Sequence, residues 1–304
     1  MSWSKDMIFG AASAAYQVEG AYNSDGRGLS IWDALSDGHV KHGDNGNTAC
    51  DEYHRFRDDI ALMKKLNLQA YRFSVSWPRV IPKEGVVNEK GIRYYQNLVD
   101  EVLAQGMIPM VTLYHWDLPM WMHEKGGWYS DEIVDRFASY VEVVVNALSD
   151  RVKYWMTMNE AATFIGAGYV EGVHAPFETV SRDAENYEEK VSVLTKHVLL
   201  AHGRVVQIIR KKAKLQPVIG IAMDGKFFLP DSEEEKDIEH ARQETYTEDV
   251  DCHRINWWLD PICKGTVNPV LQKKITAEEM EVIHQPIDFI GYNCYKANNF
   301  DDDN

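Results

Sequence analysis

Short β-rich segments alternate with long amphipathic segments along this chain, and this alternation limits its fold more than any other feature. Six segments have the composition of strands, and they cover residues 9–13, 70–75, 108–114, 154–158, 218–223 and 287–293. Between the first five, apolar residues recur at spacings of three and four, the period of a helix with one buried face. The clearest stripes cover residues 53–63, 92–103, 133–148 and 191–208. An unbroken alternation of strand and helix predicts parallel βαβ units.

The length of the chain is compatible with one domain. A chain of 304 residues would suit two domains of ~150 residues, but an α/β barrel uses ~250 residues as a single domain. No Gly-, Ser- or Pro-rich linker and no low-complexity stretch divides the sequence. Hydrophobic residues make up 45% of the chain, which is enough for a large core and excludes wholesale disorder. We therefore predict a single domain over residues 1–304.

The charge balance argues against two classes of partner. The chain has 47 Asp and Glu residues against 32 Lys and Arg residues, a net charge of −15. Such a charge repels phosphate backbones and anionic lipids, so we expect no nucleic-acid partner and no membrane partner. The densest basic run, 210–212, ends a helical stripe, and the acidic run 231–237 suits a helix N-terminus. Because no apolar run reaches ~18 residues and the N-terminus lacks a signal-peptide layout, we expect a cytoplasmic protein.

The cysteines and histidines form no metal-binding pattern. Cys50, Cys252, Cys263 and Cys294 are widely separated, and the sequence has no CxxC pair, no HExxH motif and no zinc-type Cys/His spacing. It also has neither a P-loop nor a Gly-x-Gly-x-x-Gly motif. We therefore predict four free thiols, with Cys294 buried in the sixth strand, and expect no metal and no cofactor.

Polar side chains follow four of the predicted strands at the point where each strand ends. In parallel α/β proteins the functional sites lie at these carboxyl ends. The residues found there are Gln17 after the first strand, His115 and Trp116 after the third, Asn159 and Glu160 after the fourth, and Asn293 and Tyr295 after the sixth. Amides and imidazole can bind hydroxyl groups, an indole face can cover C–H groups, and a carboxyl group can transfer a proton. This combination is typical of a sugar site.

Each of these residues also has a purely structural interpretation. Taken alone, Trp116 is more often a core residue than a sugar platform, and His115 is more often a hydrogen-bonded structural histidine. Glu160 is different, because a carboxyl group directly after an apolar strand is partly desolvated and is rarely placed there for stability. The acids near the first helix, Asp51, Asp58 and Asp59, are expected to have capping and surface roles.

Six motifs, in order along the chain, resemble those of the family 1 glycoside hydrolases, the β-glucosidase and 6-phospho-β-glycosidase group. The matching stretches are residues 9–13 with 17–20, 30–33, 71–79, 111–119, 157–160 and 288–295. The resemblance implies an α/β fold, a (β/α)8 TIM barrel. It also implies that the barrel is incomplete and C-terminally truncated, with strands one to six present and strands seven and eight missing.

The resemblance also implies a role for each matching residue. Glu160 would be the general acid/base of a retaining hydrolysis, which uses two carboxyl groups ~5–5.5 Å apart. Tyr295 would orient the nucleophile and Arg72 would hold its carboxylate. The substrate-binding residues would be Gln17, His115, Asn159 and Asn293, with Trp116 beside the ring. The implied substrate is a β-linked glucoside or a related small carbohydrate.

Two departures from the family pattern stand out. Ala161 follows Glu160 where many relatives have Pro, which changes backbone stiffness rather than chemistry. The family nucleophile is a Glu in a Thr-Glu-Asn-Gly motif on the seventh strand, and this sequence contains no such motif. Its last glutamates, Glu278, Glu279 and Glu281, belong to a polar helical stretch before the sixth strand. We therefore predict no detectable hydrolysis of an aryl β-glucoside by these residues alone.

The implied open barrel leads to a stability prediction. A complete eight-stranded barrel has no edge strands, because its first strand pairs with its eighth. If about six to eight large apolar side chains lose burial at ~1.5–3 kcal/mol each, the loss is on the order of 10–20 kcal/mol. A typical domain is stable by only ~5–15 kcal/mol. We expect these residues to be marginally stable, to self-associate, or to be completed by another polypeptide.

Three interpretations of function remain open on the sequence. The leading one is a β-glucosidase-like hydrolase of O-glycosyl compounds that acts in carbohydrate metabolism. The second is a non-catalytic sugar-binding or interaction module that uses the same polar residues without turnover. The third is an inactive truncated gene product. Sugar binding without hydrolysis would favour the second, and aggregation on expression would favour the third.

Overall fold

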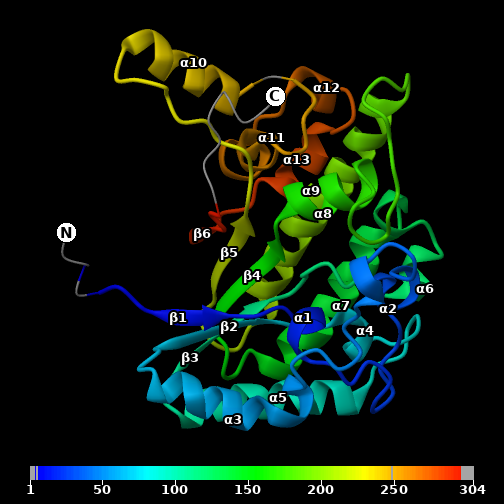
Figure 1. The fold of residues 1–304 in the computed structure, drawn as a ribbon, viewed down its shortest axis with the longest axis vertical. Coiled ribbons are helices and arrows are strands. Elements are labelled where there is room, and N and C mark those ends of the chain that lie inside the picture. Colours follow the sequence, from blue (N-terminus) through cyan, green and yellow to red (C-terminus); the bar gives the residue numbers. More distant parts are fainter. Residues whose placement is uncertain (1–3, 5, 248, 296–304) are drawn as a thin grey trace. The chain divides into compact units, whose positions relative to one another are not determined.

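The structure is a computed structural model that describes residues 4, 6–247 and 249–295 (Figure 1). The chain divides into two compact units. The first comprises Met1–Gly127, Ser139–Thr157 and Ile208–Gly220, and the second comprises Trp128–Ala138, Met158–Gln207 and Ile221–Asn304. The prediction of a single domain stays a prediction.

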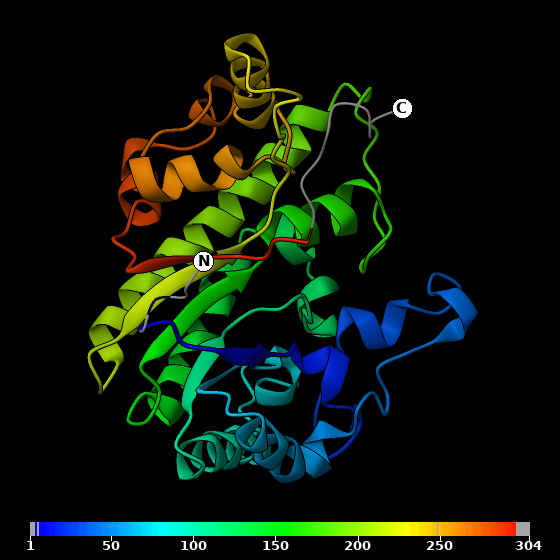
Figure 2. The ribbon, with the colours of Figure 1, turned by 60° about the vertical axis from the view of Figure 1, so that its left-hand side comes forward.

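Six strands form one sheet in the order in which they occur in the chain (Figures 1 and 2). They are β1 (Gly10–Ala12), β2 (Ala70–Ser74), β3 (Ile108–Thr112), β4 (Tyr154–Asn159), β5 (Val218–Met223) and β6 (Phe289–Tyr292). The pairing of β1 with β2, β2 with β3, and β3 with β4 is parallel. Sequential order with helices between the strands is the arrangement that successive βα units produce. All six predicted strands are present.

The first unit contains the helices that were predicted after the first two strands. Its elements are α1 (Ala15–Val18), α2 (Ile31–Leu35), η1 (Lys41–Gly43), α3 (Glu52–Lys65), α4 (Trp77–Val80), α5 (Glu89–Ala104) and α6 (Met120–His123). On α3 and α5 the apolar stripes are buried, with Ile60 and Val99 fully inaccessible to solvent. Asn88 caps α5 by accepting from the Lys90 amide. Asp51 precedes α3, but its side chain makes no capping hydrogen bond and instead pairs with His54 at the surface, so of the predicted capping and surface roles it has the surface one.

The second unit contains mainly the elements after β4. Its elements are α8 (Ala161–Ile165), the π-helix η3 (Gly166–Val170), α10 (Glu235–Thr245), α11 (Ile255–Leu259), the π-helix η4 (Asp260–Lys264), α12 (Pro269–Gln272) and α13 (Ala277–Ile283). The remaining helices of the chain are η2 (Gly127–Tyr129), α7 (Ile133–Leu148) and α9 (Tyr187–Lys212). The basic run 210–212 ends α9, and acids of the run 231–237 begin α10. Glu278, Glu279 and Glu281 lie in α13. All three placements confirm the predictions.

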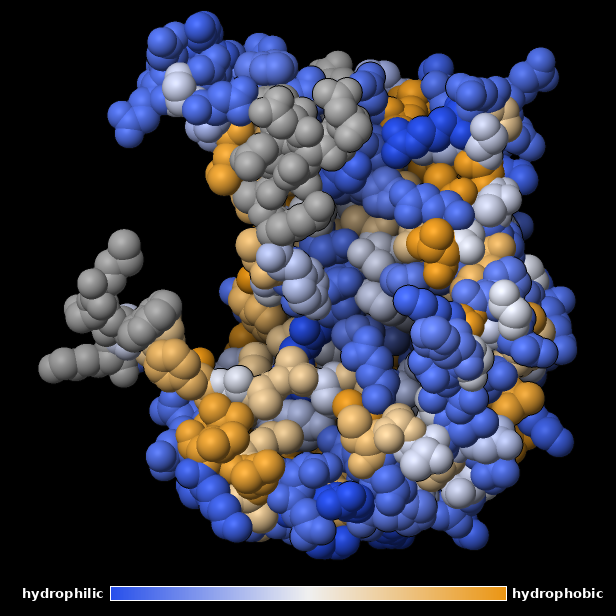
Figure 3. Space-filling view, in the orientation of Figure 1, coloured by the Kyte–Doolittle hydropathy of each residue, from blue (hydrophilic) through white to orange (hydrophobic). Residues whose placement is uncertain are grey.

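The strand order ends at β1 and β6, and apolar side chains are exposed beside both. Ile8, just before β1, is 50% exposed, and Ile290 in β6 is 47% exposed. Figure 3 shows hydrophobic surface, in orange, in the region where Figure 1 places β1. Within the described chain, therefore, the two outermost strands have apolar residues in contact with solvent.

Two further findings concern the cysteines and the helices. All four cysteines are free, but only Cys252 is buried, and Cys294 is exposed. The predicted burial of Cys294 is wrong because β6 ends at Tyr292, two residues earlier.

Among the helices that the structure describes, none is both long and apolar enough to cross a bilayer.

Candidate active site

The predicted site residues divide between the two units. Gln17, Arg72, His115 and Trp116 belong to the first unit, and Asn159, Glu160, Asn293 and Tyr295 belong to the second. Within each unit all of them except Arg72, which lies inside β2, lie at or after the ends of strands, because parallel strands end at the same edge of their sheet.

In the first unit, Gln17 lies on the short helix α1 directly after β1, and its side chain is exposed. The Ala15 amide at the start of α1 donates to the Ser74 hydroxyl at the end of β2 (2.7 Å). Arg72 lies in the middle of β2 and donates from Nε to Thr112 Oγ1 at the end of β3 (2.9 Å). The ends of the first three strands are therefore joined by side-chain hydrogen bonds.

His115 and Trp116 follow β3 and lie against each other, with ring centroids 5.0 Å apart. Burial lowers the pKa of His115 to about 3, and the positive charge of Arg72 acts in the same direction. The imidazole is therefore neutral at neutral pH, with one nitrogen to donate and one to accept a hydrogen bond. Trp116 has a φ of 81°, an unusual backbone conformation for a bulky residue, and such strain is concentrated at functional sites.

Asp117, next to this pair, is a buried acid with an unusual environment. Its side chain is completely buried, and neither carboxyl oxygen has a well-aligned hydrogen-bond partner within the described chain. Burial raises the pKa of Asp117 to about 8, although the nearby Ser76 hydroxyl and Arg27 oppose the rise. The carboxyl is therefore largely neutral at pH 7.

In the second unit, Asn159 is the last residue of β4, and Glu160 follows it at the start of α8. Both side chains are buried. Glu160 has a left-handed backbone, with φ 53° and ψ 67°, and its amide donates to the Ala222 carbonyl of β5 (2.8 Å). The chain thus turns sharply where β4 ends, which places a carboxyl group at the strand terminus.

Asn293 was predicted to bind substrate, and the structure places it on Glu160. Its side-chain amide donates to Glu160 Oε1 and to Asn159 Oδ1, and its backbone amide donates to Met223 of β5 (2.8 Å). The ends of β4, β5 and β6 therefore converge on the Glu160 carboxyl. Tyr295 lies beyond the end of β6 and is 87% exposed, and its predicted role stays a prediction.

Two titratable residues near Glu160 were missed on the sequence. Asp224 directly follows β5, and burial raises its pKa to about 6, with a further contribution from the charge of Glu160. His174 is half-buried, and burial lowers its pKa while the charge of Glu160 opposes that shift. Asp224 had the same signal as Glu160, an acid directly after an apolar strand. His174 lies in a loop and had no such signal.

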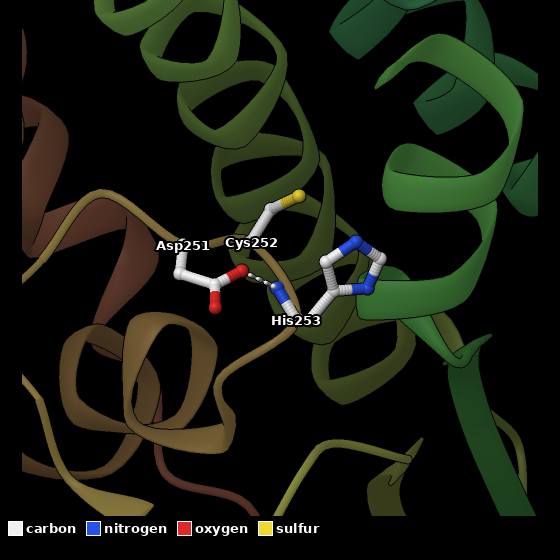
Figure 4. Close-up of side chains that lie close together, drawn as sticks. All are labelled: Asp251, Cys252 and His253. Atoms are coloured by element: carbon white, nitrogen blue, oxygen red, sulfur yellow. Dashed lines mark hydrogen bonds between the residues drawn. The ribbon is translucent and has the colours of Figure 1, made fainter. Parts of the chain in front are cut away.

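Asp251, Cys252 and His253 form a cluster that could be considered for a metal ion, because their potential metal-binding atoms lie within 4.8 Å of one another. Figure 4 shows the Asp251 carboxyl accepting from the His253 backbone amide (3.0 Å). Asp251 also pairs with Arg254 (3.1 Å), and burial raises the pKa of Cys252 to about 12. A neutral thiol and a carboxylate already neutralised by arginine are poor ligands, so these residues do not suit a metal ion.

Comparison with known proteins identifies similar sequences over the whole chain. The family model described as "Glycosyl hydrolase family 1" matches residues 1–304. Beta-glucosidase A of Acetivibrio thermocellus is 38% identical over 98% of this chain and 66% of its own length. Beta-glucosidase A of Thermotoga maritima is 40% identical over 95% of this chain and 64% of its own length. The chain thus spans less than two thirds of the length of these curated relatives.

Solved structures give the same result for the fold. The beta-glucosidase from Thermotoga maritima in complex with deoxynojirimycin matches with a TM-score of 0.84 and 37% identity, over 99% of this chain and 68% of that one. A beta-glucosidase from Exiguobacterium marinum matches with a TM-score of 0.86 and 37% identity, over 98% and 67% of the two chains. These matches and the sequential strand order confirm the predicted fold class, an incomplete (β/α)8 barrel with strands one to six.

Proposed function

Since the chain belongs to glycosyl hydrolase family 1, we propose that its 304 residues carry the acid/base half of a β-glucosidase-like active site. In this proposal Glu160 gives its proton to the leaving oxygen of a β-linked glucoside. The observation that carries the proposal is the position of Glu160. Its carboxyl is buried at the end of β4, on a left-handed backbone, and accepts a hydrogen bond from Asn293.

The contacts of Glu160 suit a residue that changes its protonation state during a reaction. A carboxyl group that receives one amide hydrogen bond retains a second oxygen for a proton or a leaving group. The amide of Asn293 fixes the rotamer of the carboxyl through bonds to Glu160 and Asn159. Asn293 would therefore act on the substrate partly through Glu160.

Residues of the first unit would recognise the sugar. A neutral His115 can both donate to and accept from a hydroxyl group, Gln17 offers an exposed amide, and Trp116 offers an indole face. Arg72 would bind a carboxylate, because its guanidinium can form two parallel hydrogen bonds with one. This assignment follows the family resemblance residue by residue.

The second carboxyl of a retaining pair would have to come from a residue outside this sequence, since the family nucleophile motif is absent from it. A small anion can replace a missing nucleophile. Azide would attack the anomeric carbon from the face opposite the leaving group. The C–N bond would form while the C–O bond breaks, and the proton of Glu160 would pass to the leaving oxygen. The product would be an α-glucosyl azide, inverted at the anomeric carbon.

The test incubates residues 1–304 with a β-glucoside that has a poor leaving group, in the presence and in the absence of azide. Nuclear magnetic resonance then assigns the configuration of the product. We expect no turnover without azide and α-glucosyl azide with it. Replacing Glu160→Gln should lower the azide-dependent rate by roughly 10²–10⁴-fold, the usual contribution of a general acid. Glu185→Gln, an exposed acid in a loop, serves as the matched control and should leave the rate unchanged.

Other results would contradict the proposal. Hydrolysis without azide that Glu160→Gln abolishes would mean that a nucleophile lies within these residues. A β-configured azide product would mean the same, because retention at the anomeric carbon requires a first displacement by a nucleophile of the protein. Binding of deoxynojirimycin without azide-dependent turnover would support the non-catalytic sugar-binding module instead. That alternative is favoured by one observation, the absence of the nucleophile motif.

A further inference from the structure

Asp224 is a buried acid of the second unit that the proposed chemistry does not use. It follows β5 directly, and its Oδ2 accepts a hydrogen bond from the Thr163 hydroxyl of α8. Its Oδ1 is buried without a well-aligned partner in the described part of the chain. A buried carboxyl group in this state is unfavourable for folding, so its position requires a reason.

The surroundings of Asp224 come from three elements. Thr163 of α8 donates a hydrogen bond to it, Glu160 at the end of β4 acts on it through its charge, and Asp224 in turn acts on Tyr292 of β6. Burial is the main reason why the pKa of Asp224 is raised to about 6. The Thr163 hydrogen bond lowers it and the charge of Glu160 raises it further. The charge of Glu160 therefore acts on the Asp224 carboxyl from a neighbouring strand end.

The hydrogen bonds also connect Asp224 to the backbone of Glu160. Glu160 directly precedes α8 as its N-cap residue, and Thr163 is the third residue of the helix. The Glu160 amide donates to the Ala222 carbonyl, two residues before Asp224. The end of β5 thus holds the left-handed turn on one side through Ala222 and on the other through Asp224 and Thr163.

We propose that Asp224 is a positioning residue for Glu160: its bond to Thr163 fixes the first turn of α8, and its carboxyl is electrostatically coupled to that of Glu160. The catalytic consequence rests on the proposed function, but the coupling and the anchoring do not. A non-glycine residue in the left-handed region keeps that conformation only when its surroundings enforce it. The bond between Asp224 and Thr163 is such a constraint.

The coupling is tested without catalysis by titrating the side-chain carboxyl carbons of 13C-aspartate-labelled protein by nuclear magnetic resonance. The signal of Asp224 is assigned by its loss in Asp224→Asn. We expect a midpoint near 6. Glu160→Gln should lower the midpoint of Asp224, because it removes a like charge, and Thr163→Val should raise it, because it removes a stabilising hydrogen bond. Thr163→Ser keeps the hydroxyl and should leave it unchanged.

The anchoring is tested by hydrogen exchange at the Phe164 amide, which donates to the Glu160 carbonyl in the first turn of α8. Asp224→Ala and Thr163→Val should accelerate this exchange on the order of tenfold, whereas Asp224→Asn, whose amide oxygen can still accept from Thr163, should change it little. The coupling would be overturned if the titration midpoint of Asp224 is the same in Glu160→Gln as in the unmodified chain. The anchoring would be overturned if the exchange rate of the Phe164 amide is unchanged in Asp224→Ala.

Azide-dependent turnover gives the catalytic readout. Asp224→Ala should lower kcat on the order of tenfold to a hundredfold with little change in KM, because a displaced acid impairs proton transfer more than sugar binding. An equal loss in an exposed control, Asp183→Ala, would overturn this consequence. If no variant turns over any glucoside, the proposed function fails, while the titration and the exchange still decide the coupling and the anchoring.

Discussion

Trp116 and Glu160 both have left-handed backbones, with φ values of 81° and 53°. A non-glycine residue in a sparsely populated backbone region loses ~1–3 kcal/mol relative to a relaxed one. Both residues were singled out on the sequence for their chemistry, not for their conformation. At the scale of single residues, two of the candidate site residues therefore also have a strained backbone.

Asp117 provides a prediction at the residue scale. Its pKa rises from 3.8 to about 8 on folding, so between these values the unfolded chain releases a proton that the folded chain retains. Stability due to this residue is therefore greatest below pH 4 and falls as the pH rises to about 8, by about 6 kcal/mol at most. In Asp117→Asn this loss should disappear.

The measurement compares the melting temperatures of Asp117→Asn and the unmodified chain between pH 4 and pH 8. The variant should become progressively more stable than the unmodified chain across this range. Asp183→Asn, at an exposed position, is the control and should follow the unmodified chain. A constant difference between Asp117→Asn and the unmodified chain at every pH would contradict the prediction.

At the scale of elements, two helices of the second unit approach each other at a glycine. A Cβ added to Gly203 of α9 would lie 1.9 Å from the Val282 carbonyl oxygen of α13. Backbone at that distance cannot move aside as a flexible side chain could. The absence of a side chain at Gly203 is therefore what allows α13 to pack against α9.

Gly203→Ala tests this contact, because two effects oppose each other there. Helix propensity alone favours Ala by about 1 kcal/mol, whereas an overpacked contact typically destabilises by ~1–3 kcal/mol. We expect the clash to prevail and the urea midpoint to fall. Arg204→Ala, next to it on the exposed face of α9, should change stability by less than ~0.5 kcal/mol. A rise in the midpoint for Gly203→Ala would refute the contact.

At the scale of the whole molecule, the sheet has two outermost strands with apolar residues exposed beside them. Unpaired strand edges bind to other strands, and natural proteins prevent this with charged residues. Ile8 and Ile290 are about half exposed beside β1 and in β6. These positions are consistent with the expectation from the sequence that residues 1–304 self-associate, which stays a prediction.

Charges at both edges should reduce that association. We expect sedimentation velocity to show concentration-dependent oligomers for residues 1–304 and a shift towards monomer for the double variant Ile8→Lys/Ile290→Lys. Val173→Lys is the control, because Val173 is 61% exposed in a loop and belongs to neither strand. If the unmodified chain is monomeric at every concentration, the exposed edges do not drive association.

The sequence predicted much of this structure because strand and helix signals are local. The stripe on α9 and the basic run at its end were readable directly, since both repeat within a few residues. Predictions that depended on the exact residue at which a strand ends were wrong or were missed. Cys294 was placed inside the sixth strand although β6 stops at Tyr292, and Asp224 was overlooked although it follows β5 as directly as Glu160 follows β4.

The amino-acid sequence by itself determined the family, the order of the six strands and the presence of an acid at the end of the fourth, because these follow from motifs and periodicity along the chain. Only the tertiary structure placed the amide of Asn293 on Glu160 and the carboxyl of Asp224 on Thr163. These partners are 133 and 61 residues apart in the chain. Their contact depends on strand pairing, and the pKa of Asp224 depends on the burial that this packing creates, neither of which has a local signature in the sequence.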